Sequence, residues 1–289
     1  MEFVFKTKSP SLSRVFILAC LFVFICVPLV FAERLSEPFD HSKWDGFLKT
    51  VVNERGEVNF ELAKKHAAEL NDYLDYFANS EFKRSDFQSH WPREEQLAAF
   101  LNIYHASLIK LILEYYPIKS VQDVPGFWDL GVVWIGNENS YSLNAIRERS
   151  LIGAFRDEKI HTALACAAKS CPGFPQEAFT GPLVEGQLYL ASRKFVNSED
   201  YVRIDLEHEK VYLSRILQWY AKDFKLDFGF TDEYEIFTDV ENAVLSFVAY
   251  YMEDADKINF LEQRRYKIKY LPFDWGLNEW HSDQGTAQS

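Results

Sequence analysis

The feature that most constrains the fold is a long apolar segment, Arg93 to Tyr115, bounded by Pro92 and Pro117. Neither proline nor glycine interrupts it, which favours one continuous helix that stops before Pro117. Its apolar residues lie on nearly every side of that helix: Leu97, Phe100, Leu101, Ile103, Leu108, Ile109, Leu111 and Ile112. A helix that is apolar all round must be enclosed by protein. We therefore predict a central, buried helix around which the remaining elements pack.

Composition sets the class of protein. The chain has 289 residues, of which 48% are hydrophobic, and a formal net charge of −12. So many apolar residues exclude a disordered or collagen-like chain. The acidic balance argues against nucleic acid as a partner, and against adhesion to anionic lipid. No linker or repeat divides the sequence, so we expect one domain over residues 33–280 and a disordered tail over residues 281–289.

The first residues have the organisation of a secretory signal peptide. Lys6, Lys8 and Arg14 precede an uncharged apolar run from Val15 to Ala32. Basic, apolar and small-residue regions in this order are typical of an export signal, here residues 1–32. An uncleaved N-terminal anchor is the alternative, because the run is just long enough to span a bilayer. We expect an exported protein, periplasmic or secreted. No other segment is expected to cross a membrane.

Along the remaining sequence, hydrophobic periodicity predicts an α+β fold, a mostly helical single domain with a small antiparallel sheet. A hairpin is expected at residues 131–136, with its second strand near Tyr141. Ser142 should cap a helix that reaches Ala154. The other expected helices cover residues 40–55, 61–77, 160–169, 183–197, 214–222 and 239–252, and the other strands cover residues 202–204, 211–213 and 267–271.

One segment, Ile160 to Pro172, concentrates residues capable of covalent chemistry. It contains His161, Cys166 and Cys171, with four residues between the cysteines. In an oxidising compartment such a pair forms either a small-loop disulfide or a functional thiol site. The spacing is not that of a Cys-x-x-Cys redox motif, and three candidate ligands are too few for zinc, so we predict no metal. A catalytic cysteine paired with a histidine stays open beside buried, inert thiols.

Other polar residues lie in apolar surroundings. Asn102, Tyr104 and His105 fall within the predicted buried helix, where they form either a structural network or a cluster facing a cleft. Asp274 stands among large aromatic residues, where a carboxylate can orient a histidine. The remaining histidines are expected at the surface: His41, His66, His90, His208 and His281. The phosphate-binding, zincin and serine-hydrolase motifs are missing from the sequence, and we predict no cofactor.

Several segments together resemble the domain-of-unknown-function 547 family. They are residues 39–45, 100–106, 111–120, 142–146, 160–172 and 270–275, in the family's order. The resemblance implies a histidine ahead of the Cys-Ala-x-x-Ser-Cys-Pro motif, with Cys166 as the better candidate for a reactive group and Cys171 as support. The sequence departs from the family at His105, commonly asparagine, and at Arg147-Glu148, commonly Glu-His.

Three functions remain open. The first is a cysteine-dependent hydrolase or acyltransferase on peptide-like amides. Cys166 would be its nucleophile and His161 or His105 its base, with Asn102, Tyr104 or Asp274 in support. The second is a non-catalytic binding module for an unknown small-molecule, peptide or protein partner. The third is thiol–disulfide exchange through Cys166 and Cys171.

Overall fold

The computed structural model describes residues 39–78, 91–136, 139–229 and 236–281. All described residues belong to one compact unit, Pro38–Ser289. The predicted signal peptide and most of the predicted tail lie outside the described residues.

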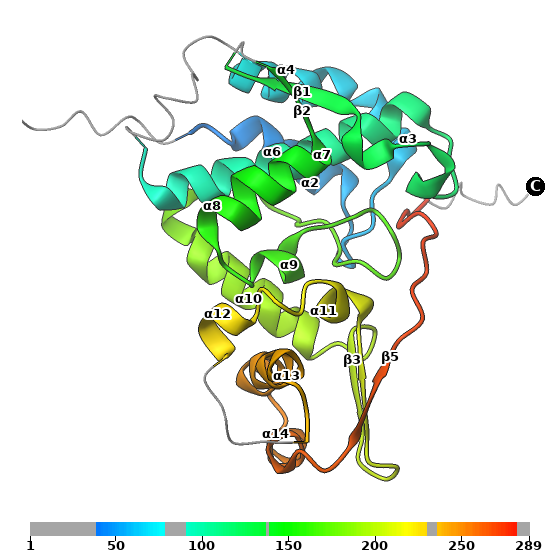
Figure 1. Cartoon of the computed structure of the whole chain (residues 1–289). Coiled ribbons are helices and arrows are strands. Elements are labelled where there is room, and N and C mark those ends of the chain that lie inside the picture. The colour runs from blue at the N-terminus through cyan, green and yellow to red at the C-terminus, as the bar shows by residue number, and fades with distance from the viewer. Residues whose placement is uncertain (1–38, 79–90, 137–138, 230–235, 282–289) are drawn as a thin grey trace, which may run out of the picture. The chain divides into compact units, whose positions relative to one another are not determined.

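The α+β, mostly helical class is confirmed (Figure 1). The helices are α2 (Ser42–Val51), α3 (Phe60–Lys65), α4 (Ala67–Ala78), α6 (Arg93–Tyr115), α7 (Leu143–Ala145), α8 (Gly153–Phe155), α9 (Ile160–Ala163), α10 (Val184–Val196), α11 (Arg215–Trp219), α12 (Lys225–Phe228), α13 (Asp239–Tyr251) and α14 (Ala255–Gln263). Short turns η1 (Val121–Asp123), η2 (Phe127–Asp129) and η4 (Gly181–Leu183) are 3₁₀-helical, and η3 (Ile146–Ile152) is π-helical. The strands are β1 (Gly131–Ile135), β2 (Asn139–Ser142), β3 (Val202–Asp205), β4 (Lys210–Leu213) and β5 (Lys267–Tyr270).

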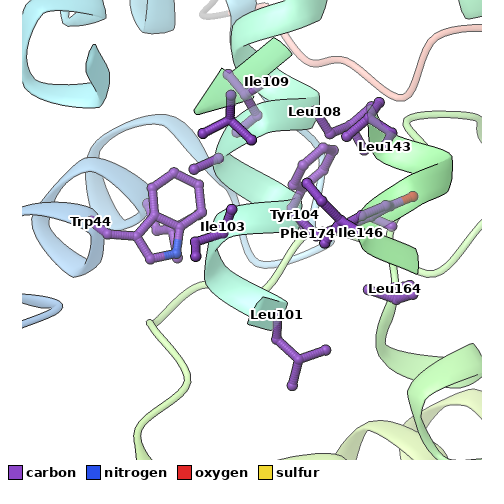
Figure 2. Close-up of a cluster of buried hydrophobic side chains, with 14 of the residues drawn as sticks. Trp44, Leu101, Ile103, Tyr104, Leu108, Ile109, Leu143, Ile146, Leu164 and Phe174 are labelled. Atoms are coloured by element: carbon purple, nitrogen blue, oxygen red, sulfur yellow. The ribbon is translucent and has the colours of Figure 1, made fainter. Parts of the chain in front are cut away.

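Helix α6 is the buried central helix that the sequence predicts, with the predicted bounds. Figure 2 shows Trp44 on one side of it and Leu143 with Ile146 on the other. These side chains belong to a large hydrophobic core built from α2, α3, α4, α6, β1 and α10. By length and composition α6 could also cross a membrane, contrary to the expectation that only the N-terminal run is apolar enough, but most of it is buried inside the protein. Because this large hydrophobic core encloses α6, the helix carries apolar residues on nearly every side.

The strands form two separate sheets. β1 and β2 make the predicted antiparallel hairpin. β3 and β4 are antiparallel, but β5 runs parallel to β4, so the expectation of a purely antiparallel sheet is wrong for this pair. The reason is the connection: α11, α12, α13 and α14 lie between β4 and β5 in the chain. A crossover of this length returns the chain in the same direction, which a tight hairpin cannot do.

A second hydrophobic core fills the space between this three-stranded sheet, α11, α13 and the end of α10. Figure 1 shows α13 beside α14 near the sheet. Thr238 starts α13 with a capping box, in which its hydroxyl accepts from the Glu241 N–H and the Glu241 carboxylate accepts from the Thr238 N–H. Cys171 and Ala168 belong to this second core, and Trp275 packs against both cores. The cysteine segment therefore lies where the two cores meet.

Some predicted helix bounds are wrong, and two helices, α12 and α14, were not predicted. α9 ends at Ala163, six residues before the predicted end, because Leu164 is extended (ψ 112°) and Ala167 has a left-handed backbone (φ 58°). The predicted helix after Ser142 contains the π-helical turn η3, which hydrophobic periodicity does not distinguish from α-helix. α14 was not predicted, because within it only Leu261 is fully buried and the apolar pattern is weak.

Candidate functional site

Cys166 and Cys171 form a disulfide, with their Cα atoms 5.7 Å apart. The two residues differ in exposure, since Cys166 is partly exposed and Cys171 is only 1% exposed. Cys171 is anchored further, because the Tyr201 hydroxyl donates a 2.8 Å hydrogen bond to its carbonyl. Of the two sulfur-bearing residues, solvent thus reaches Cys166 more easily.

The backbone of this disulfide loop, residues 166–171, is held by the segment 274–278. Lys169 N–H donates to the Gly276 carbonyl (2.9 Å), and Asn278 N–H donates to the Ala167 carbonyl (2.8 Å). Asp274 N–H donates to the Ser170 hydroxyl at 2.9 Å. Ala167 has φ 58°, a conformation that costs a non-glycine residue free energy unless its surroundings impose it. Contacts with residues outside the loop therefore hold its shape in addition to the sulfur–sulfur bond.

His105 supports the same loop from below. It is fully buried on α6, its Nδ1 donates to the Leu101 carbonyl (2.8 Å), and its Nε2 accepts from the Ala165 N–H (3.2 Å). Both ring nitrogens are used, which fixes the neutral tautomer. Burial lowers the pKa of His105 to about 4. In this arrangement the ring orients the backbone just before Cys166 and has no free nitrogen to act as a base.

Asn102 holds the other side of the cysteine segment. Its Oδ1 accepts from the Phe179 N–H (2.9 Å) and from Trp44 Nε1 (3.1 Å), and its Nδ2 donates to the Phe179 carbonyl (2.8 Å). The side chain is completely buried. Asn102 therefore attaches the chain that follows Cys171 to α6, and its polar atoms already have protein partners.

His161 is the histidine whose geometry resembles a catalytic one. From α9, its Nε2 donates to the Asp223 carboxylate at 2.8 Å, and its ring stacks on Tyr220 with centroids 4.2 Å apart. The imidazole is buried while Asp223 is partly exposed. A carboxylate on one ring nitrogen orients the imidazole and makes the other nitrogen, Nδ1, the basic one.

A charged group adjoins this pair. The Arg147 guanidinium lies over the Tyr220 ring, 5.7 Å from its centroid, and Arg147 Nε donates to the Glu148 carboxylate at 2.9 Å. Burial raises the pKa of the Tyr104 hydroxyl well above its ordinary value. The charges of Arg147 and Glu148 have smaller effects on it, in opposite directions. This chain thus places an arginine–glutamate pair next to Tyr220, on which the His161 ring stacks.

A pocket of about 290 Å³ opens behind the disulfide loop, and we call it the α10 pocket. Its walls come from α9, α10 and the segment 172–179. Among the described residues, no three His, Cys, Asp or Glu side chains are placed to hold a metal ion.

The structure places the predicted residues in three groups. Cys166, Cys171 and Asp274 meet at the disulfide loop, with Asp274 exposed and its Oδ1 accepting from the Gly276 N–H. Asn102 and His105 lie beneath that loop as backbone anchors, and His161 faces Asp223. Sequence reasoning missed Asp223 and Tyr220. Asp223 is 62 residues from its partner, and no local motif marks it.

Comparison with known proteins and protein families gives a match to a family model. No curated protein and no solved structure matches the chain. A family model described as "Protein of unknown function, DUF547" matches residues 88–196, a range that contains α6, η3, α9 and the disulfide loop. The resemblance seen in the sequence motifs is therefore confirmed over residues 88–196, which match the DUF547 family model.

Proposed function

We propose that this protein, exported by its N-terminal segment, carries out thiol–disulfide exchange through Cys166 and Cys171. The observation that supports the proposal is an accessible disulfide whose loop is held by hydrogen bonds to residues 274–278. Such a loop keeps its shape when the disulfide opens, so the two sulfurs stay close enough to re-form the bond. A disulfide that serves stability alone gains most from closing a long loop, whereas this one closes a short one.

The reaction follows from the unequal burial of the two residues. A thiolate of a partner dithiol attacks Sγ of Cys166, the more exposed residue, to form a mixed disulfide, and Cys171 leaves as a thiolate. The partner's second thiolate then attacks the partner's other sulfur, the one bonded to Cys166 in the mixed disulfide. This closes the partner's disulfide and releases Cys166 as a thiolate. Two electrons pass from the partner to the protein, the partner ends as a disulfide, and both cysteines end as thiols. The reverse direction oxidises a partner dithiol.

A second candidate is nucleophilic attack by reduced Cys166 on a peptide-like amide, as a hydrolase or acyltransferase. The observation that favours it is the hydrogen bond between His161 and Asp223, which leaves Nδ1 of the imidazole as a base. His161 comes from α9, which ends three residues before Cys166.

One experiment tests both candidates. The full chain is equilibrated in glutathione buffers between about −300 and −180 mV, then alkylated and analysed by peptide mass spectrometry, with circular dichroism as the control for folding. We expect reversible reduction in the folded state, fast alkylation of Cys166 in Cys171→Ser, and slow alkylation of Cys171 in Cys166→Ser. A disulfide that opens only on unfolding would contradict the exchange proposal.

The nucleophile candidate is read from the same Cys171→Ser protein. Its alkylation rate is measured from pH 4 to 10 with and without His161→Ala. A thiol pKa well below about 8.5 that rises in the double variant supports a His161-assisted nucleophile. A pKa that His161→Ala does not move argues against it and leaves exchange as the function.

A further inference from the structure

The α10 pocket combines an apolar interior with positive charge at its opening. Phe174, Phe179 and Phe195 are buried side chains that line it, and Leu190, 62% exposed, forms part of its edge. An exposed leucine beside an aromatic interior is a surface that an apolar ligand would cover.

Three polar side chains of the pocket, Gln187, Thr162 and Tyr201, already have partners within the protein. Gln187 donates from Nε2 to the Ala178 carbonyl and accepts at Oε1 from the Thr180 N–H. The Thr162 hydroxyl donates to the Lys159 carbonyl and lies 2.8 Å from that of Ser192. The Tyr201 hydroxyl is used by Cys171. None of these groups needs a ligand to satisfy it.

The cations at the opening are different. Arg55 and Lys194 are exposed and line the pocket, and neither forms an ion pair with any residue in the described part of the chain. Glu177 is the single carboxylate among the lining residues, so the local charge is positive on a chain of net charge −12. A local reversal of charge at a concave apolar site favours an anionic ligand.

Arg55 reaches the pocket through a close backbone crossing. The turn at Gly56 meets the segment 172–174 so tightly that a Cβ atom on Gly173 would lie 2.8 Å from the Arg55 carbonyl oxygen. Phe174 N–H donates to the Gly56 carbonyl at 2.9 Å. The same backbone contact therefore positions both Phe174, in the wall of the pocket, and Arg55, a cation that lines it.

From these observations we infer that the α10 pocket binds a carboxylate carried on one aromatic or branched apolar group. The apolar group fills the phenylalanine-lined interior, and the carboxylate lies at the opening toward Arg55 and Lys194. At about 290 Å³ the pocket takes one such group, which is a small aryl acid or the C-terminal residue of a peptide. Neither cysteine lines the pocket, so this inference does not depend on the proposed exchange reaction.

The test compares two ligands of the full chain, 3-phenylpropionate and its neutral analogue 3-phenylpropanamide. Binding of each is measured by calorimetry or NMR titration. We expect saturable binding of the acid that is at least about tenfold tighter than that of the amide. Lys194→Gln and Arg55→Gln should each weaken binding of the acid about three- to tenfold, while binding of the amide stays the same. Lys222→Gln, an exposed lysine outside the pocket, is the matched control and should change neither.

The peptide Ala-Ala-Phe, with a free or amidated C-terminus, separates the two sources of the ligand. Tighter binding of the free peptide than of 3-phenylpropionate identifies a peptide C-terminus, and weaker binding identifies a small acid. Equal affinity for acid and amide, no saturable binding, or equal loss in Lys222→Gln would each overturn the inference. The substituted residues are exposed, so the substitutions are not expected to change folding.

Discussion

At the scale of single residues, Glu158 is a carboxyl group whose ionisation is strongly altered by the fold. It lies between α8 and α9, 3% exposed, and its Oε2 has no hydrogen-bond partner among the described residues. Burial, together with a hydrogen bond to the Asp227 carboxyl group, raises the pKa of Glu158 to about 7. Two neighbouring carboxyl groups cannot both ionise without repulsion, so below about pH 7 the protein keeps a proton on Glu158.

We predict that Glu158→Gln stabilises the protein at alkaline pH. A carboxyl whose pKa is raised on folding contributes stability below its unfolded pKa, near 4.5, and loses that contribution as pH rises through about 7. Urea unfolding at pH 8 should show Glu158→Gln about 1–2 kcal/mol more stable than the wild type, with little difference at pH 4. Glu199→Gln, at an exposed site, is the control. Equal stability of Glu158→Gln and wild type at both pH values would refute the prediction.

At the scale of elements, the close crossing of residues 53–57 and 172–174 joins two distant parts of the chain. Gly56 has φ 78°, and a Cβ atom there would lie 2.7 Å from the Gly173 Cα. Only glycine at both positions lets the backbones approach so closely. The crossing connects the turn after α2 to the chain that follows the disulfide.

We predict that Gly173→Ala destabilises the protein by about 2–3 kcal/mol, because its Cβ meets backbone atoms that cannot move aside. Gly186→Ala is the matched control, since Gly186 lies in α10 with no atom within 4 Å of an added Cβ. That variant should gain about 0.5–1 kcal/mol from helix propensity. The measurement is urea unfolding of both variants. A Gly173→Ala protein as stable as wild type would show that the crossing can widen freely.

At the scale of the whole molecule, the acid limit of stability depends on two buried neutral histidines. His41, expected at the surface, is 5% exposed instead, and its Nδ1 lies 2.8 Å from the Tyr73 hydroxyl. Phe39 and Phe77 also surround it, a packing that its polar sequence neighbours do not reveal. Burial lowers the pKa values of His41 and His105 to about 4.

These two residues should make the protein sensitive to mild acid. A histidine with a lowered folded pKa contributes stability above its unfolded pKa of 6.5, and that contribution is lost as pH falls to about 4. We predict that His41→Asn reduces the pH dependence of the unfolding free energy over this range by about 1–3 kcal/mol, measured by denaturant titration. His66→Asn, at the surface beside Glu69, should leave it nearly unchanged. An identical slope in His41→Asn and wild type would contradict the assignment.

The sequence predicts the parts of the fold that local patterns determine. Helix α6 has the predicted bounds because its prolines and apolar residues are local signals, and the same holds for the hairpin and α13. The end of α9 could not be predicted, since Ala167 takes its left-handed backbone where residues 276–278 pair with the loop. The partner of His161 is likewise set by tertiary structure. Two of the candidate site residues, Asn102 and His105, bond to backbone groups that tertiary structure brings to them, which no local signal in the sequence indicates.

The pairing of residues 274–280 with three distant parts of the chain has a consequence for the order of assembly. This segment bonds to Lys119, to the loop at Ala167 and Lys169, and to Val58, and Trp280 Nε1 donates to the Val51 carbonyl. Ribosomes make these residues after both cysteines. An emerging chain therefore holds both cysteines before it has the backbone partners that shape their loop. The native cysteine geometry is completed only after synthesis has passed Trp280, so oxidation before that point acts on an unformed site.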